Sequence, residues 1–261
     1  MLARECFWLW GHESGSHNET WDLPGSSRIS PVEAACYMGI PNVIMVHYKT
    51  ADPLPPDHQY LVPFRTLRRV VWSVVGSGGA HRDDEVDRVL EVSKLLPAME
   101  GVIMDDFFRQ GQKDAGVLSV AELQELRTRL ARSGRPLDLW VVLYDHQLDL
   151  PVASHVGLCD KVAFWTWKAE QLVNLEANFG RLERMVPDGR HRVLGCYMWD
   201  YGQKRPMPLE LMKKQCELGL RWLKEKRIDG MIFLASCICD LDLETVEWTR
   251  RWIEQVGGEE V

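Results

Sequence analysis

The chain has 261 residues, a formal net charge of −7 and seven cysteines. A chain of this length suits one large domain and buries enough surface to fold without disulfides or metal ions. The acidic balance argues against a nucleic-acid surface, which is normally basic. The sequence therefore predicts a single domain over residues 1–261 with no nucleic-acid partner.

The cysteines favour a reducing compartment. Their number is odd, and Cys6, Cys196 and Cys237 lie in or at the end of apolar runs, where a thiol packs as a small apolar side chain. The first apolar run is shorter than the ~7–15 residues of a signal-peptide core, and no run approaches the ~18 residues of a membrane span. We therefore expect a cytoplasmic protein with no membrane partner, and its oligomeric state stays open.

Eight short apolar runs are spread along the chain, and a segment with helical spacing follows each run. Nearly continuous apolar runs are typical of buried parallel strands. The runs are Cys6–Trp10, Asn42–Val46, Val70–Val74, Gly101–Met104, Leu139–Leu143, Val162–Trp165, Val193–Met198 and Met231–Ala235. Eight β-α units in a chain of this length predict an α/β protein with a (β/α)8 TIM barrel fold.

Signals for helix starts and loops agree with the barrel. A capping box begins at Ser119, and Pro31 follows the plausible cap Ser30 at the position that a first-turn proline prefers. The longest irregular stretches, 11–30 and 49–57, each follow a predicted strand. In this fold the loops after the strands form the catalytic face, so we expect both stretches to lie there.

The fourth predicted strand ends in two adjacent acids, Asp105 and Asp106. Two acids at the end of a buried strand are costly unless they are paired or catalytic. Because side chains alternate along a strand, Asp105 points into the barrel if Ile103 does, and Asp106 then lies at the rim or braces a loop. Both acids are candidate catalytic residues. The alternative is a structural pair, in which one acid caps a loop and the other binds a buried arginine.

The segment from Gly101 to Phe108 resembles the fourth strand of several glycoside hydrolase-like (β/α)8 barrel families. In those families a glycine, an apolar run, two acids and an aromatic residue end in catalytic or sugar-binding acids. The segment is also similar to chitinase-type strands, in which Asp105 would be the middle acid. A chitinase carries further acids at the positions of Ile103 and Phe107, and their absence argues against substrate-assisted chemistry. The resemblance implies an intracellular glycoside hydrolase or a related carbohydrate-active enzyme.

Asp200 follows the seventh apolar run. Hydrolysis at an anomeric carbon uses two carboxyl groups. Since the fourth and seventh strands face each other across a barrel, Asp105 or Asp106 could pair with Asp200 as acid/base and nucleophile. The alternative for Asp200 is a salt bridge to the following loop, at Lys204 or Arg205.

Aromatic and polar residues gather where the predicted strands end. The face of an aromatic ring packs on the apolar C–H face of a sugar, while histidines and carboxylates bind hydroxyl groups. The candidate substrate-binding residues are Trp10, His12, His47, Tyr48, Tyr144, Asp145, Trp165, Trp167, Trp199 and Tyr201. Each ring alone could be barrel packing, but so many at one end favour a small carbohydrate or glycoside as the partner.

Two other functions remain open on the same fold. A metal-dependent sugar isomerase, epimerase or lyase would use His12 and His47 with Asp105 and Asp145. These residues are dispersed, and the glycine-rich stretch 76–79 matches no nucleotide fingerprint, so no metal or cofactor is expected. A non-catalytic sugar-binding barrel would keep the aromatic pocket without turnover. Fold alone does not separate these possibilities.

Overall fold

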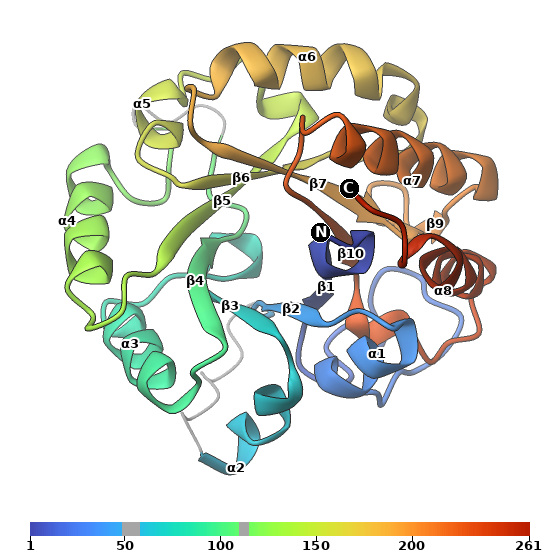
Figure 1. Cartoon of the computed structure of the whole chain (residues 1–261), viewed down its shortest axis with the longest axis horizontal. Coiled ribbons are helices and arrows are strands. Elements are labelled where there is room, and N and C mark those ends of the chain that lie inside the picture. The colour runs from blue at the N-terminus through green and yellow to red at the C-terminus, as the bar shows by residue number, and fades with distance from the viewer. Residues whose placement is uncertain (49–57, 110–114) are drawn as a thin grey trace.

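The computed structural model describes residues 1–48, 58–109 and 115–261. Within these residues eight parallel strands close into a barrel, in the order β1-β10-β7-β6-β5-β4-β3-β2, and helices surround it (Figure 1). The strands are β1 Phe7–Gly11, β2 Asn42–Met45, β3 Arg69–Val75, β4 Met99–Met104, β5 Asp138–Tyr144, β6 Lys161–Trp165, β7 His191–Tyr197 and β10 Gly230–Leu234. The prediction of a (β/α)8 barrel is confirmed, and every predicted apolar run overlaps one of these strands.

The outer layer consists, in the described part of the chain, of eight α-helices. They are α1 Pro31–Met38, α2 His58–Leu61, α3 Glu85–Leu95, α4 Val120–Ala131, α5 Ala153–Val156, α6 Leu175–Met185, α7 Leu209–Lys224 and α8 Glu244–Val256. The predicted caps are confirmed, because Oγ of Ser30 and Oγ of Ser119 each accept a hydrogen bond from the backbone three residues later. Helices α2 and α5 have only four residues each. The irregular stretch expected at 49–57 lies outside the described residues.

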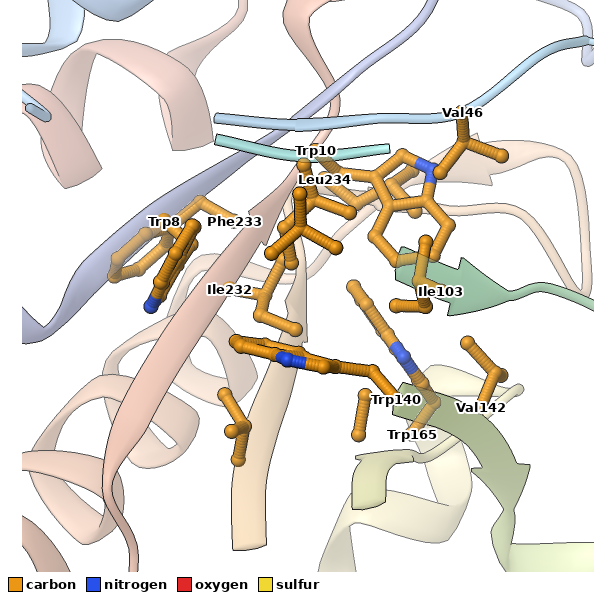
Figure 2. Close-up of a cluster of buried hydrophobic side chains, with 14 of the residues drawn as sticks. Trp8, Trp10, Val46, Ile103, Trp140, Val142, Trp165, Ile232, Phe233 and Leu234 are labelled. Atoms are coloured by element: carbon orange, nitrogen blue, oxygen red, sulfur yellow. The ribbon is translucent and has the colours of Figure 1, made fainter. Parts of the chain in front are cut away.

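Indole rings fill the interior of the barrel. Trp8 meets Trp140 edge-on at 5.1 Å between ring centroids, and Trp10 meets Trp165 edge-on at 5.4 Å (Figure 2). Gly195 in β7 makes room for the second pair, since a Cβ atom there would lie 2.1 Å from Cδ2 of Trp165. The barrel is thus a packed core, and the Trp10–Trp165 pair closes it on the side where the strands end.

One feature of the fold was not predicted. After β7 the chain leaves the barrel and forms a small antiparallel hairpin, in which β8 Trp199–Asp200 pairs with β9 Arg205–Pro206. The hairpin sets Asp200 opposite Arg205. Trp199 and Asp200 therefore belong to this hairpin and are not a continuation of the seventh barrel strand.

The states of the cysteines and the lengths of the helices relate to the predicted reducing compartment and to the predicted absence of a membrane span. All seven cysteines are free thiols; Cys36 is exposed and the others are buried. No helix in the described ranges has the length and apolar character needed to cross a bilayer. The cytoplasmic location stays a prediction.

Candidate active site

A cavity of about 240 Å³ lies at the end of the barrel where the strands finish, and we call it the inner cavity. Its floor includes the Trp10–Trp165 pair seen in Figure 2. Nine of the predicted site residues line it: Trp10, His12, Tyr48, Asp105, Asp106, Tyr144, Trp165, Trp167 and Tyr201. The structure therefore brings most of the predicted site together around one small space.

Both acids that follow β4 reach the inner cavity. Asp105 is only 6% exposed, and its Oδ1 accepts a hydrogen bond from the backbone N–H of Asp106 at 2.8 Å. Asp106 has a φ of 45°, in the left-handed region that few residues other than glycine adopt. This backbone turn interrupts the strand alternation, which explains how two adjacent residues line the same cavity.

The carboxylate of Asp106 is held by two neighbouring segments. Its Oδ1 accepts a hydrogen bond from the hydroxyl of Tyr144 at 2.8 Å, and its Oδ2 accepts one from the backbone N–H of Gly78 at 2.7 Å. Gly78 has a φ of 73°, which glycine adopts without steric cost. The glycine-rich turn after β3 thus braces a candidate catalytic acid, so Asp106 has the loop contact expected from the sequence as well as access to the cavity.

The two acids have different electrostatic surroundings. Burial, followed by the negative charge of Asp106, raises the pKa of Asp105 well above its usual range. Burial also raises the pKa values of the Tyr144 and Tyr197 hydroxyls, which therefore remain hydrogen-bond donors at neutral pH. A buried acid whose pKa is raised, beside a hydrogen-bonded carboxylate, is the kind of pair that divides acid and base roles in an enzyme.

His12 forms a wall of the inner cavity with both ring nitrogens engaged. Its Nε2 accepts a hydrogen bond from Nε1 of Trp10 at 3.1 Å, and its Nδ1 lies 2.8 Å from the carbonyl oxygen of Val46. Because that carbonyl only accepts, the proton sits on Nδ1. Burial lowers the pKa of His12, in keeping with a neutral ring. This arrangement suits a fixed wall better than an acid/base or a metal ligand.

His47 and Trp199 are not among the described residues that line the inner cavity. Nδ1 of His47 lies 2.9 Å from Oε1 of Glu13, and Nε1 of Trp199 donates a hydrogen bond to the carbonyl oxygen of Trp21 at 3.0 Å. Glu13 and Trp21 belong to the long loop after β1. His47 therefore ties this loop to the segment after β2, and Trp199 ties it to the hairpin of β8 and β9. These positions do not favour direct contact of either residue with a ligand in the inner cavity.

Asp200 lies outside the inner cavity as well, as far as the described lining shows. Its Oδ2 accepts a hydrogen bond from Nε of Arg205 at 3.1 Å, and its Oδ1 accepts one from the backbone N–H of Ala169 at 3.3 Å. The side chain is fully buried in this arrangement. The hairpin therefore produces the salt bridge considered as the alternative, and a catalytic role for Asp200 stays a prediction without support from its position.

Six further residues that line the inner cavity are not among the sequence candidates: His17, Trp21, Ser77, Gly78, Tyr197 and Leu234. Tyr197 ends β7 two residues after Gly195, so strand alternation could have identified it. His17 and Trp21 come from the loop after β1. Nδ1 of His17 lies 3.2 Å from the hydroxyl of Tyr201, and Trp21 donates a hydrogen bond to the hydroxyl of Tyr48 at 2.9 Å. A loop without periodicity carries no sequence signal for such contacts.

A larger depression of about 760 Å³ adjoins the inner cavity, and we call it the outer groove. Asp106, Tyr144 and Trp167 line both spaces. Asp145 lines the outer groove, where Oδ1 accepts a hydrogen bond from the backbone N–H of Trp167 at 3.1 Å. Burial favours a higher pKa for Asp145, but the hydrogen bonds from His146 and from the N–H of Trp167 outweigh the effect of burial. The net result is a lowered pKa for Asp145.

The residues proposed as metal ligands do not converge. The described part of the chain contains no group of three or more His, Cys, Asp or Glu side chains placed to hold a metal ion. His12 has both nitrogens in hydrogen bonds, His47 is engaged by Glu13, and Asp145 faces the outer groove. The donor set of the metal-dependent alternative therefore does not fit this geometry.

The chain matches no protein-family model, and no curated protein is similar to it in sequence. Its fold is nevertheless shared with solved structures. A putative α-L-fucosidase from Bacteroides thetaiotaomicron VPI-5482 is 11% identical, with a TM-score of 0.61 and an alignment that covers 99% of this chain and 98% of that chain. A fungal endo-β-N-acetylglucosaminidase of glycosyl hydrolase family 18 is 10% identical, with a TM-score of 0.57 and coverage of 94% and 95%.

A glycoside hydrolase family 17 β-1,3-glucanosyltransferase from Rhizomucor miehei is also similar. It is 10% identical, with a TM-score of 0.55, and the alignment covers 89% of this chain and 87% of that chain. At such identities the similarity is one of fold. The chain has a barrel of the kind found in glycoside hydrolases, as the resemblance of the fourth strand implied.

Proposed function

We propose that the protein is a glycoside hydrolase whose reaction takes place in the inner cavity, between Asp105 and Asp106. The observation that carries the proposal is the pairing of a buried acid, whose pKa is raised, with a carboxylate held by Tyr144 and Gly78. Asp200 is not part of the proposed pair. The surrounding indole and phenol rings give a sugar apolar faces to pack on.

In the proposed reaction Asp105 donates its proton to the glycosidic oxygen as the bond to the anomeric carbon breaks. The carboxylate of Asp106 stabilises the positive charge that develops at that carbon. The hydroxide part of a water molecule then adds to the anomeric carbon, and the remaining proton of that water returns to Asp105. Since Asp105 must be protonated to start the cycle, activity is expected to fall as the pH rises through its pKa.

The experiment compares two variants on two leaving groups. A panel of 4-nitrophenyl glycosides of fucose, N-acetylglucosamine and glucose, in both anomeric forms, first identifies a responsive sugar. For that sugar, Asp105→Asn is expected to lower kcat/KM at least ~100-fold on an alkyl glycoside, and much less on the glycosyl fluoride, whose leaving group needs no proton. Asp106→Asn is expected to lower kcat/KM at least ~100-fold on both substrates.

The matched control is Asp188→Asn, which changes an exposed aspartate in a turn far along the chain from both acids. It is expected to leave kcat/KM within about twofold. If Asp106→Asn rather than Asp105→Asn spares the fluoride, the two roles are exchanged. If both variants keep wild-type turnover, the acid pair is not catalytic. Sugar binding by the wild type without any turnover would favour the non-catalytic barrel.

A further inference from the structure

The volumes of the inner cavity and of the outer groove indicate how large a substrate the site can bind. We infer that the inner cavity takes one terminal sugar, and that the outer groove binds the rest of a longer, uncharged and hydroxyl-rich glycan or glycoside as the leaving group. The protein would then remove single sugars from the end of a chain. This inference rests on the proposed hydrolase function and names the substrate class of that site.

The volumes limit what each space can hold. The inner cavity, at about 240 Å³, lies below the ~300–1,000 Å³ of pockets that enclose drug-sized ligands, whereas the outer groove, at about 760 Å³, lies well within that range. The floor of the inner cavity includes Trp10 and Trp165, both 1% exposed and packed into the barrel core. A glycan cannot continue through this floor, so only a chain end fits there.

The position of the shared residues fixes where the bond would be cut. Asp106, Tyr144 and Trp167 line both spaces and so form the boundary between them. Asp106 is the group proposed to face the anomeric carbon. A sugar in the inner cavity with its anomeric carbon at Asp106 keeps its glycosidic oxygen in the inner cavity, which Asp105 also lines, and directs the group attached to that oxygen into the outer groove.

The lining of the outer groove suits hydroxyl groups. Gln171 and Asn178 contribute amides, which offer both donors and acceptors to a hydroxyl. Gln171 is exposed and Asn178 is half-buried on α6, so both are accessible. The rings of Tyr144 and His146 stack with centroids 5.4 Å apart and an interplanar angle of 15°, which gives the groove a flat aromatic wall.

The charges in the outer groove also favour an uncharged partner. Asp145 and Asp106 are acidic, while Lys168 is basic. No arginine lines the groove in the described part of the chain, and arginine is the side chain best suited to bind a carboxylate or phosphate in two-point contact. Neither a strongly anionic nor a strongly cationic leaving group is therefore selected.

The test uses a double variant, Gln171→Ala with Asn178→Ala. The measured quantity is the ratio of kcat/KM on a disaccharide to kcat/KM on the glycosyl fluoride of the same responsive sugar, because the fluoride has no second sugar to place in the groove. Loss of two hydrogen bonds is expected to lower this ratio about 10-fold. Gln255→Ala, at an exposed amide on α8, is the matched control and should leave the ratio unchanged.

The possible outcomes separate the inference from the proposed function. A ratio unchanged by the double variant, in an enzyme that turns over both substrates, overturns the inference and leaves the hydrolase in place. If the wild type turns over no glycoside of the panel, the proposed hydrolase function is wrong. The inference about the two binding spaces is then tested by measuring sugar affinity. Titration with laminaritriose and with glucose should then show tighter binding of the trisaccharide, weakened about 10-fold by the double variant, and equal binding of the two sugars overturns the inference.

Discussion

The hydroxyl of Tyr144 donates a hydrogen bond to Oδ1 of Asp106, with 2.8 Å between the two oxygens. The two residues come from the ends of neighbouring strands, β5 and β4. Burial raises the pKa of the Tyr144 hydroxyl, so it remains a donor. Since both residues line the inner cavity and the outer groove, this contact, together with the one from the backbone N–H of Gly78, holds the proposed catalytic carboxylate at the boundary between them.

Tyr144→Phe is expected to lower kcat/KM on a responsive glycoside about 10- to 100-fold. The reason is that a hydrogen bond to a charged group contributes ~1.5–3 kcal/mol, and its loss leaves Asp106 less well oriented. Steady-state kinetics with a far-ultraviolet circular dichroism check of folding measure the effect. Tyr37→Phe is the control, because it removes a tyrosine hydroxyl that donates to Glu247 on the outer surface. Equal effects of the two changes would refute a special role for Tyr144.

Asp105→Asn is expected to stabilise the folded protein at pH 7. Burial raises the pKa of Asp105 in the folded state, so the stability that Asp105 contributes is fully present below its unfolded-state pKa of ~3.9 and is lost as the pH rises through its folded-state pKa. Asparagine does not ionise, so the variant does not lose this stability as the pH rises.

Thermal unfolding at pH 7 and pH 3 measures the change. The variant should melt at least ~2 °C above the wild type at pH 7, the shift that about 1 kcal/mol produces in a domain of this size, with a smaller difference at pH 3. The exposed Asp188→Asn serves as the reference and should change the melting temperature little at either pH. If the variant melts at a lower temperature than the wild type at pH 7, the buried Asp105 carboxyl does not destabilise the folded protein at that pH.

Asp200→Asn is expected to affect stability more than catalysis. The change keeps an acceptor for the backbone N–H of Ala169 but removes the charge paired with Arg205, which should destabilise the fold by about 1 kcal/mol. We expect kcat/KM to fall less than ~10-fold, against at least ~100-fold for Asp105→Asn. Arg205→Ala removes the other partner and should give a comparable loss of stability. A ~100-fold loss of kcat in Asp200→Asn at an unchanged melting temperature would restore the catalytic role.

The sequence by itself determines the barrel. Apolar runs of strand length alternate with segments of helical period, and this local pattern is enough because each β-α unit buries its own strand and one face of its own helix. The fourth strand shows the agreement: Gly101–Met104 is predicted and Met99–Met104 is observed. The same local reasoning identifies Asp105 and Asp106, since two acids that end a buried apolar strand stand out without any knowledge of their neighbours.

Only the tertiary structure decides which other side chains share the cavity with these acids. Trp199 binds the backbone of Trp21 across 178 positions of sequence, and this contact holds the loop that brings His17 to the cavity. Asp200 follows a strand as expected, yet its hairpin partner Arg205 draws the carboxylate away. The physical reason is the same in each case. Periodicity reports which residues are buried, whereas hydrogen bonds between distant segments determine where a polar side chain points, and no local pattern records them.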